Sequence, residues 1–180
     1  MERELAIYVS ASSEMDVECE LLGQLLAGLT KSIRWIITRT PIDHENANPD
    51  LQALRSSQFY LILLGMDIFA PMGVEWLAAK NMGLSTFAFR NVARIPSPAA
   101  AFFAHNAELP WQRYRTPQEF SRLFEHALIT QLIEGTPGYG LSVTDIEDLS
   151  RRLTDAEADS ESPDEERRGA GGGGVILPTG

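Results

Sequence analysis

Short apolar runs that alternate with segments of helical spacing constrain the fold of this chain more than any other feature. The run "FYLILLG" at residues 59–65 is apolar throughout, as a central strand of a parallel sheet is. Alternating strands and helices predict a parallel sheet with helices on both faces. We therefore predict an α/β fold: a flavodoxin-like (Rossmann-like) three-layer sandwich with a five-stranded parallel sheet in the order 2-1-3-4-5.

Residue type predicts the strands, and apolar spacing predicts the helices. Strands are expected near residues 4–9, 34–39, 59–64, 85–90 and 110–114, with the first strand between the second and the third. Helices are expected at residues 14–28, 49–56, 73–82, 98–105, 117–133 and 142–153. Asn48 and Pro49 are read as the N-cap and the first residue of the second helix, and Gly83 as the end of the third.

A change of composition divides the chain into a domain and a tail. Residues 1–154 are predicted to form one α/β domain, and residues 155–180 a disordered acidic and Gly-rich tail. Residues 155–168 hold seven acidic residues and two arginines, and the run "GAGGGG" follows them as a flexible linker. The chain ends on "VILPTG", which is read either as a docking segment for a partner or as an inert end.

Charge and composition exclude several classes of function. The formal net charge of -10 would repel nucleic acid and anionic membrane surfaces. One cysteine and three scattered histidines predict no disulfide and no metal site, and we expect no cofactor. No apolar run approaches the roughly 20 residues that span a bilayer, and no signal peptide is recognisable at the N-terminus. A cytoplasmic location is therefore expected.

The predicted strand order places a candidate site between the first and third strands. The sheet reverses direction there, and ligands of open α/β sheets bind outside the C-terminal ends of such strands. The loops "SASS" at residues 10–13 and "GMDIFAPMG" at residues 65–73 flank this crevice, and Glu75 ends the second loop. Glu75 is read either as a catalytic carboxylate or as a helix-start residue stabilised by the helix dipole.

Four other residues in or near these loops also have both a functional and a purely structural interpretation. Asp67 is a second candidate acid, or caps a turn. Ser10 and Ser12 are candidate ligand contacts, or N-caps. Trp76 lines a pocket, or belongs to the core.

Two segments carry a resemblance to known families. The run "IYVSASSEMDVECE" at residues 7–20 resembles the opening of a bacterial domain family of unknown function, written V-S-S-T-F-x-D-L-x-x-E-R. Residues 54–89 resemble the L-R-x-S-D-x-F-V-x-L-L-G … E-x-x-x-A-x-x-x-G-K-P segment of that family. The same pattern is similar to nucleoside deoxyribosyltransferases and, more distantly, to Toll/interleukin-1 receptor (TIR) domains. The resemblance covers roughly residues 5–133.

The resemblance implies a role for Glu75. In the deoxyribosyltransferases and enzymatic TIR domains, a glutamate on the helix after the third strand acts on an N-glycosidic bond. Glu75 matches that position, with Gly73 before it and Gly83 at the end of the helix, and Ser10 and Ser12 match the loop that lines the pocket. With Asp67 as the second catalytic residue, the predicted ligand-binding residues are Ser10, Ser12, Gly65, Gly73 and Trp76.

Three departures from the family pattern bear on function. Gln58 replaces the usual Asp, residues 70–72 read Ala-Pro-Met where polar residues are usual, and residues 83–85 read Gly-Leu-Ser instead of Gly-Lys-Pro. Each change removes a polar group that could hold a nucleotide. They favour a bacterial signalling or conflict-system interaction module with a TIR-like fold, which self-associates or acts with a separate partner protein. The alternative is an enzyme that cleaves the N-glycosidic bond of NAD or a related nucleotide through Glu75.

Overall fold

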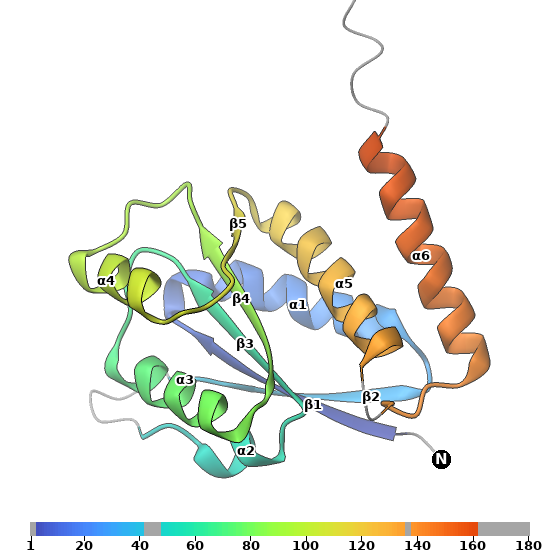
Figure 1. Ribbon diagram of the computed structural model, residues 1–180, viewed down its shortest axis with the longest axis horizontal. Coiled ribbons are helices and arrows are strands. Elements are labelled where there is room, and N and C mark those ends of the chain that lie inside the picture. The colour runs from blue at the N-terminus through green and yellow to red at the C-terminus, as the bar shows by residue number, and fades with distance from the viewer. Residues whose placement is uncertain (1–2, 42–47, 136–137, 162–180) are drawn as a thin grey trace, which may run out of the picture.

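The computed structural model describes residues 3–41, 48–135 and 138–161 and is built around a five-stranded parallel sheet. The strands are β1 (Arg3–Ala11), β2 (Ile33–Arg39), β3 (Phe59–Leu64), β4 (Ser85–Asn91) and β5 (Gln112–Tyr114). Their order is β2-β1-β3-β4-β5 (Figure 1), so the predicted fold class and strand order are confirmed. The order in which the chain adds strands reverses between β1 and β3, which is the position where the candidate site was predicted.

Helices cover both faces of the sheet (Figure 1). They are η1 (Ser13–Met15), α1 (Asp16–Leu29), α2 (Leu51–Ser56), α3 (Ala70–Met82), α4 (Pro98–Asn106), α5 (Pro117–Glu134) and α6 (Val143–Glu161). Helices α1 and α5 pack together on one face, with α6 against α5, and α2, α3 and α4 lie on the other. No helix in the described ranges is long and apolar enough to cross a membrane.

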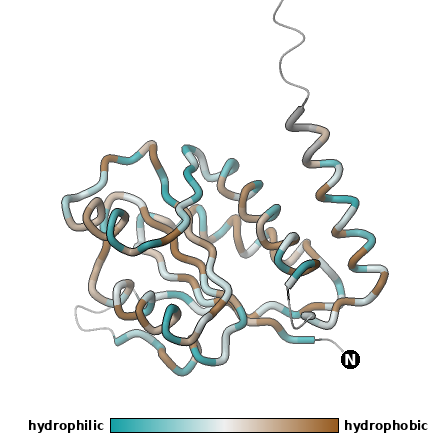
Figure 2. Tube along the Cα trace, viewed as in Figure 1, coloured by the Kyte–Doolittle hydropathy of each residue, from teal (hydrophilic) through white to brown (hydrophobic). Residues whose placement is uncertain are grey.

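The core has one apolar layer on each side of the sheet. All six residues of β3 are buried, because helices cover both of its faces, and the central strands are largely brown in Figure 2. On the α1/α5 side, the ring of Phe89 meets that of Phe120 edge to face at a centroid distance of 5.2 Å. On the α3 side, Tyr60 stacks between Tyr8 and Trp76.

The start of α3 differs from the prediction and changes the reading of Glu75. The helix begins at Ala70, three residues before the predicted residue 73, with Pro71 in its first turn. Proline suits this position because its fixed φ fits the helix and it has no N–H that could lack a partner. Glu75 therefore lies in the second turn, and the first turn holds no acidic residue. The interpretation of Glu75 as a helix-start residue is wrong.

The start of α2 also differs from the prediction. Its N-cap is Asp50, whose carboxylate accepts hydrogen bonds from the N–H groups of Gln52 and Ala53 at 3.1 and 2.9 Å. The prediction that Asn48 caps a helix starting at Pro49 is therefore wrong, because Asp50 supplies the oxygen that satisfies the free N–H groups.

Helix α6 continues beyond the predicted end of the domain at residue 154. It runs to Glu161, so residues 155–161, which composition assigns to a disordered tail, are helical. The prediction from composition was wrong here. A helix that has already formed in the preceding turns extends into the acidic segment at little free-energy cost per residue. Residues 162–180, with "GAGGGG" and "VILPTG", lie outside the described residues.

Gly83 ends α3 in the left-handed conformation, with φ 66° and ψ 33°. We expect Gly83→Ala to lower the free energy of unfolding by about 1 kcal/mol, because a Cβ disfavours this conformation. Gly23 in α1 is the matched control: it has helical geometry, and the space that a Cβ would enter is open. Gly23→Ala should raise the free energy of unfolding by about 0.5–1 kcal/mol in the same urea titration. Equal effects of the two substitutions would contradict this account.

Candidate functional site

The carboxylate of Glu75 is fully buried and accepts three hydroxyl hydrogen bonds. Its Oε1 accepts from the Tyr8 hydroxyl at 2.8 Å. Its Oε2 accepts from Thr40 Oγ1 at 2.6 Å and from Ser10 Oγ. The four side chains come from β1, from the end of β2 and from α3, so the network joins three parts of the fold.

Local periodicity brings these groups together. Tyr8 and Ser10 are two residues apart on β1 and therefore point to the same face of the sheet. On α3, the three buried residues Met72, Glu75 and Ala79 have helical spacing and form the face against the sheet. Thr40 follows the last residue of β2, and its N–H donates to the carbonyl of Val9 at 3.0 Å, which holds it beside β1.

Burial dominates the electrostatics of the site. It raises the pKa of Glu75, because desolvation disfavours the charged form, while the hydroxyls of Ser10, Thr40 and Tyr8 act in the opposite direction. Burial and the nearby Glu75 carboxylate also raise the pKa of Tyr8, so its hydroxyl keeps its proton and donates it. Tyr60 lies beside this network, and burial raises its pKa as well.

The raised pKa of Glu75 gives the stability of the protein a defined pH dependence. Between the ordinary value of 4.5 and the raised value, the folded state holds a proton on Glu75 that the unfolded state has lost. The free energy of unfolding therefore falls as pH rises through this interval, and Glu75 has no further effect on either side of it.

Glu75→Gln should remove this decline. The difference in unfolding free energy, wild type minus variant, should fall by about 1.4 kcal/mol for each pH unit that separates the folded and unfolded pKa values. Urea titrations at a series of pH values measure this difference. A difference that rises with pH would show that the hydroxyls outweigh the desolvation of Glu75.

The structure brings Ser10 to Glu75 but leaves Asp67 and Ser12 elsewhere. Asp67 is exposed; its Oδ1 accepts from Ser97 Oγ at 2.7 Å, and this hydrogen bond lowers its pKa. Ser12 is buried and donates to Glu14 Oε1 at 3.1 Å. Ser10 lies inside β1, so its reading as an N-cap is wrong, while the expectation that it faces Glu75 is confirmed.

The remaining predicted residues occupy three different settings. Trp76 is half-buried and stacks on Tyr60 at a centroid distance of 6.1 Å, as a core residue does. Gly73 lies in α3 with open space where a Cβ would be. Gly65 is buried, and the side chains of Glu14 and Met15 occupy the space that a Cβ at this residue would enter.

The sequence interpretation missed two hydroxyl partners of Glu75. Tyr8 lies in an apolar run that predicts only a strand, although its spacing of two from Ser10 places both side chains on one face of the sheet. Thr40 carries no signal, because its position depends on how the chain leaves β2.

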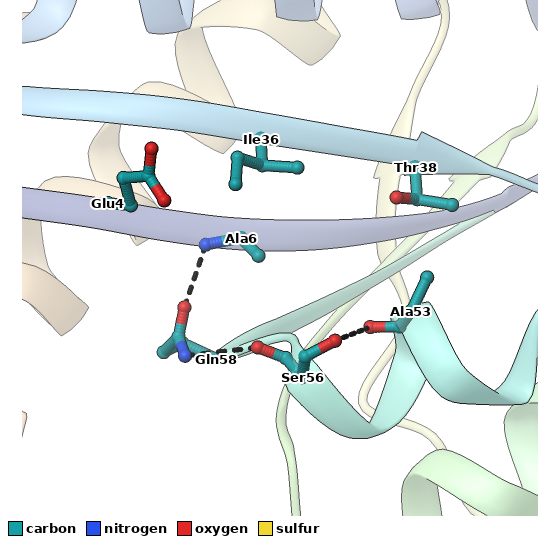
Figure 3. A pocket seen from close by; sticks show the side chains of 7 residues that line it. All are labelled: Glu4, Ala6, Ile36, Thr38, Ala53, Ser56 and Gln58. Atoms are coloured by element: carbon teal, nitrogen blue, oxygen red, sulfur yellow. Dashed lines mark hydrogen bonds between the residues drawn. The ribbon is translucent and has the colours of Figure 1, made fainter.

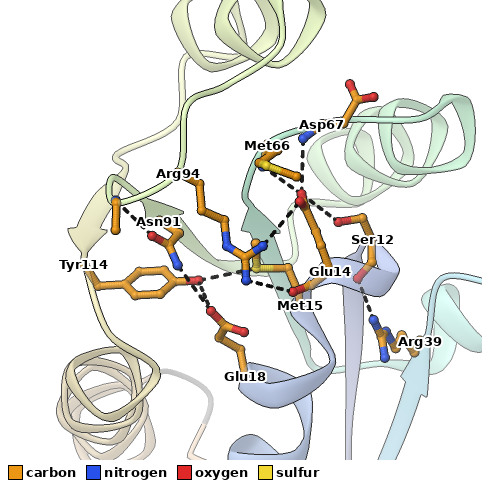
Figure 4. A network of polar contacts seen from close by, with 11 residues as sticks. Ser12, Glu14, Met15, Glu18, Arg39, Met66, Asp67, Asn91, Arg94 and Tyr114 are labelled. Atoms are coloured by element: carbon orange, nitrogen blue, oxygen red, sulfur yellow. Dashed lines mark hydrogen bonds and ion pairs between the residues drawn. The ribbon is translucent and has the colours of Figure 1, made fainter.

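A second fully buried carboxylate, Glu18, was also missed. Its Oε1 accepts from the Tyr114 hydroxyl at 3.1 Å and from Asn91 Nδ2 at 3.4 Å (Figure 4). Its Oε2 is buried without a hydrogen-bond partner among the residues that the structure describes. The spacing of Met15, Glu18 and Leu22 on η1 and α1 could have indicated it, because a carboxylate there falls within the apolar stripe.

Comparisons with protein-family models, with curated proteins and with solved structures find no match for this chain. Within the described ranges, no group of three or more His, Cys, Asp or Glu side chains could hold a metal ion.

Proposed function

We propose that this protein cleaves the N-glycosidic bond of NAD or a related nucleotide, with Glu75 as the reacting carboxylate. The observation that carries the proposal is the buried Glu75 carboxylate held by the hydroxyls of Tyr8, Ser10 and Thr40. The resemblance of the segment around Glu75 to nucleoside deoxyribosyltransferases points to the same bond.

The chemistry needs a carboxylate of fixed position. Cleavage of an N-glycosidic bond develops positive charge on the sugar ring, and a carboxylate beneath the ring stabilises that charge or forms a covalent intermediate. The hydroxyls of Tyr8, Ser10 and Thr40 hold both oxygens of Glu75 in a defined position in the closed structure. Because hydroxyl groups also accept hydrogen bonds, Ser10 and Thr40 can turn toward the hydroxyls of a bound sugar.

The cost of burying Glu75 supports a functional role. A carboxylate taken out of water loses hydration energy, and an apolar residue at this position would pack against Met72 and Tyr60 without that loss. Buried ionisable groups with shifted pKa values occur often at functional sites, where catalysis needs such values. Since Glu75 is fully buried, the reaction requires a local opening between the end of β1 and α3.

An assay of base release tests the proposal. The purified full chain is incubated with NAD and, separately, with ribonucleosides and deoxyribonucleosides, at low and high protein concentration. Chromatography then measures free nicotinamide or free base. Release above the level without protein for at least one substrate is the expected result. No release from any of them at either concentration would count against the enzyme.

The edge of the sheet favours a second candidate, an interaction module. Strand β2 is an edge strand, and Ile36 and Ile37 are 42% and 43% exposed on its opposite faces. An edge strand with exposed apolar side chains can pair with a strand of another chain. Beside it lies a hollow, shown in Figure 3. Its lining residues are Glu4, Ala6, Ile36, Thr38, Ala53, Ser56 and Gln58.

Self-association through this edge has a direct test. If β2 pairs with β2 of a second copy, the mass measured by light scattering should rise with protein concentration. Ile37→Lys should then keep the protein monomeric, because a charged residue opposes pairing of edge strands. Ile95→Lys is the control, since Ile95 is 87% exposed and lies outside the strands. A monomer at all concentrations would reject self-association.

A further inference from the structure

The carboxylate of Glu14 lies in a ring of hydrogen-bond donors at the C-terminal edge of the sheet (Figure 4). Its Oε1 accepts from the backbone N–H groups of Met66 and Asp67, which follow β3, at 2.7 and 3.1 Å. It also accepts from Ser12 Oγ, after β1, at 3.1 Å. Glu14 therefore occupies the crevice between β1 and β3, where ligands of open α/β sheets bind.

Arg94 adds a positive charge to this ring. Its guanidinium lies 3.5 Å from Glu14 Oε2 and donates to the Glu14 carbonyl at 3.1 Å. Arg94 follows β4, so donors from three loops converge on one carboxylate. Backbone N–H groups, a hydroxyl and a guanidinium together are the donor set that proteins use for phosphate groups.

Gly65 shapes the floor of the ring. A Cβ at this residue would lie 2.6 Å from Glu14 Oε1 and 2.0 Å from Cε of Met15. The φ angle of Gly65 is not in the left-handed region, so the backbone conformation does not demand glycine here. The glycine provides space for the Met15 side chain and lets the Glu14 carboxylate approach the backbone closely.

We propose that the ring formed by Ser12, Met66, Asp67 and Arg94 is a phosphate-binding site, and that Glu14 is its internal occupant until a phosphate-bearing ligand displaces it. The Glu14 side chain is 16% exposed, so it lies close enough to the surface to swing out into water. While Glu14 occupies the ring, the apparent affinity for a ligand is reduced by the fraction of sites that are closed. The inference does not depend on catalysis by Glu75.

Removal of the internal carboxylate tests the proposal. Sodium phosphate is titrated into the wild type and into Glu14→Ala at constant ionic strength, and the backbone amide signals of Met66 and Asp67 are followed by NMR. We expect the dissociation constant for phosphate to be at least about tenfold lower in Glu14→Ala, because every site is then open. The double variant Glu14→Ala/Arg94→Ala should lose this gain.

Three outcomes decide the matter. No shift of the Met66 and Asp67 signals in Glu14→Ala, or equal affinity in the double variant, would overturn the proposal. If Glu14→Ala does not fold, Glu14→Gln replaces it, because the uncharged amide competes more weakly for the ring than the carboxylate does. A phosphate affinity of Glu14→Gln equal to that of the wild type would then overturn the proposal. A parallel titration with a nucleoside 5′-monophosphate distinguishes a nucleotide from free phosphate as the source of the group, since tighter binding identifies the nucleotide.

Discussion

Replacing Glu75 with Gln should lower the rate of base release at least about 100-fold, the lower end for loss of one group that stabilises charge in the transition state. Glutamine keeps the shape of the side chain and can still contact Tyr8, Ser10 and Thr40, but it cannot carry the negative charge that stabilises the sugar cation. Turnover per molecule under saturating substrate measures the effect.

The matched control is Glu134→Gln at the exposed end of α5. It removes the same charge at a distance from the β1 network, so turnover should stay at the wild-type level. Below pH 4.5, where residue 75 is uncharged in both proteins, Glu75→Gln should stay within about 1 kcal/mol of the wild type in stability, which separates loss of chemistry from loss of fold. An unchanged rate in Glu75→Gln would exclude Glu75 as the reacting group, even if the wild type releases base.

Phe89→Ala should lower the free energy of unfolding by about 3–5 kcal/mol, the range for a buried Phe cut back to Ala. Phe89 is fully buried on β4, and its ring contacts those of Phe120, Phe124 and Tyr114 at centroid distances of 5.2, 6.1 and 6.5 Å. All three contacts are edge-to-face pairs, which stabilise beyond the area buried. A loss of this size is a large share of the total stability of an ordinary domain.

Phe102→Ala is the control for this prediction. Phe102 lies on α4 and is 71% exposed, so its truncation should change stability by less than about 0.5 kcal/mol. Urea titrations of the three proteins under one set of conditions give both values. Similar losses in the two variants would contradict the placement of the Phe89 cluster at the centre of the core.

The sequence determined the sheet because its signals are local. A run of six apolar residues has the length and composition of a strand covered on both faces, and it forms β3. Alternation with helical segments then limited the topology, so the order of strands and the crevice between β1 and β3 could be predicted. Glu75 and Ser10 could be predicted for the same reason, since Ser10 lies in β1 and Glu75 in the helix after β3, and the pattern identifies both elements.

Element boundaries were less predictable because competing residues decide them. Pro71 allows α3 to begin at Ala70, and this moved Glu75 from the first turn into the second. Asp50 caps α2 in place of Asn48, because its carboxylate meets two free N–H groups. The residue at which a helix begins depends on small differences in free energy between neighbouring candidate start positions.

The contacts between polar groups follow from tertiary packing and could not be predicted from local sequence. Glu75 lies 67 residues from Tyr8 and 35 from Thr40 along the chain, and their contact depends on the packing of α3 against β1 and on the path after β2. The approach of Glu14 to Met66 and Asp67 likewise depends on how two loops close over the end of the sheet. A sequence specifies periodicity along each element, but long-range hydrogen bonds arise from the distances between elements, which packing of the whole core determines.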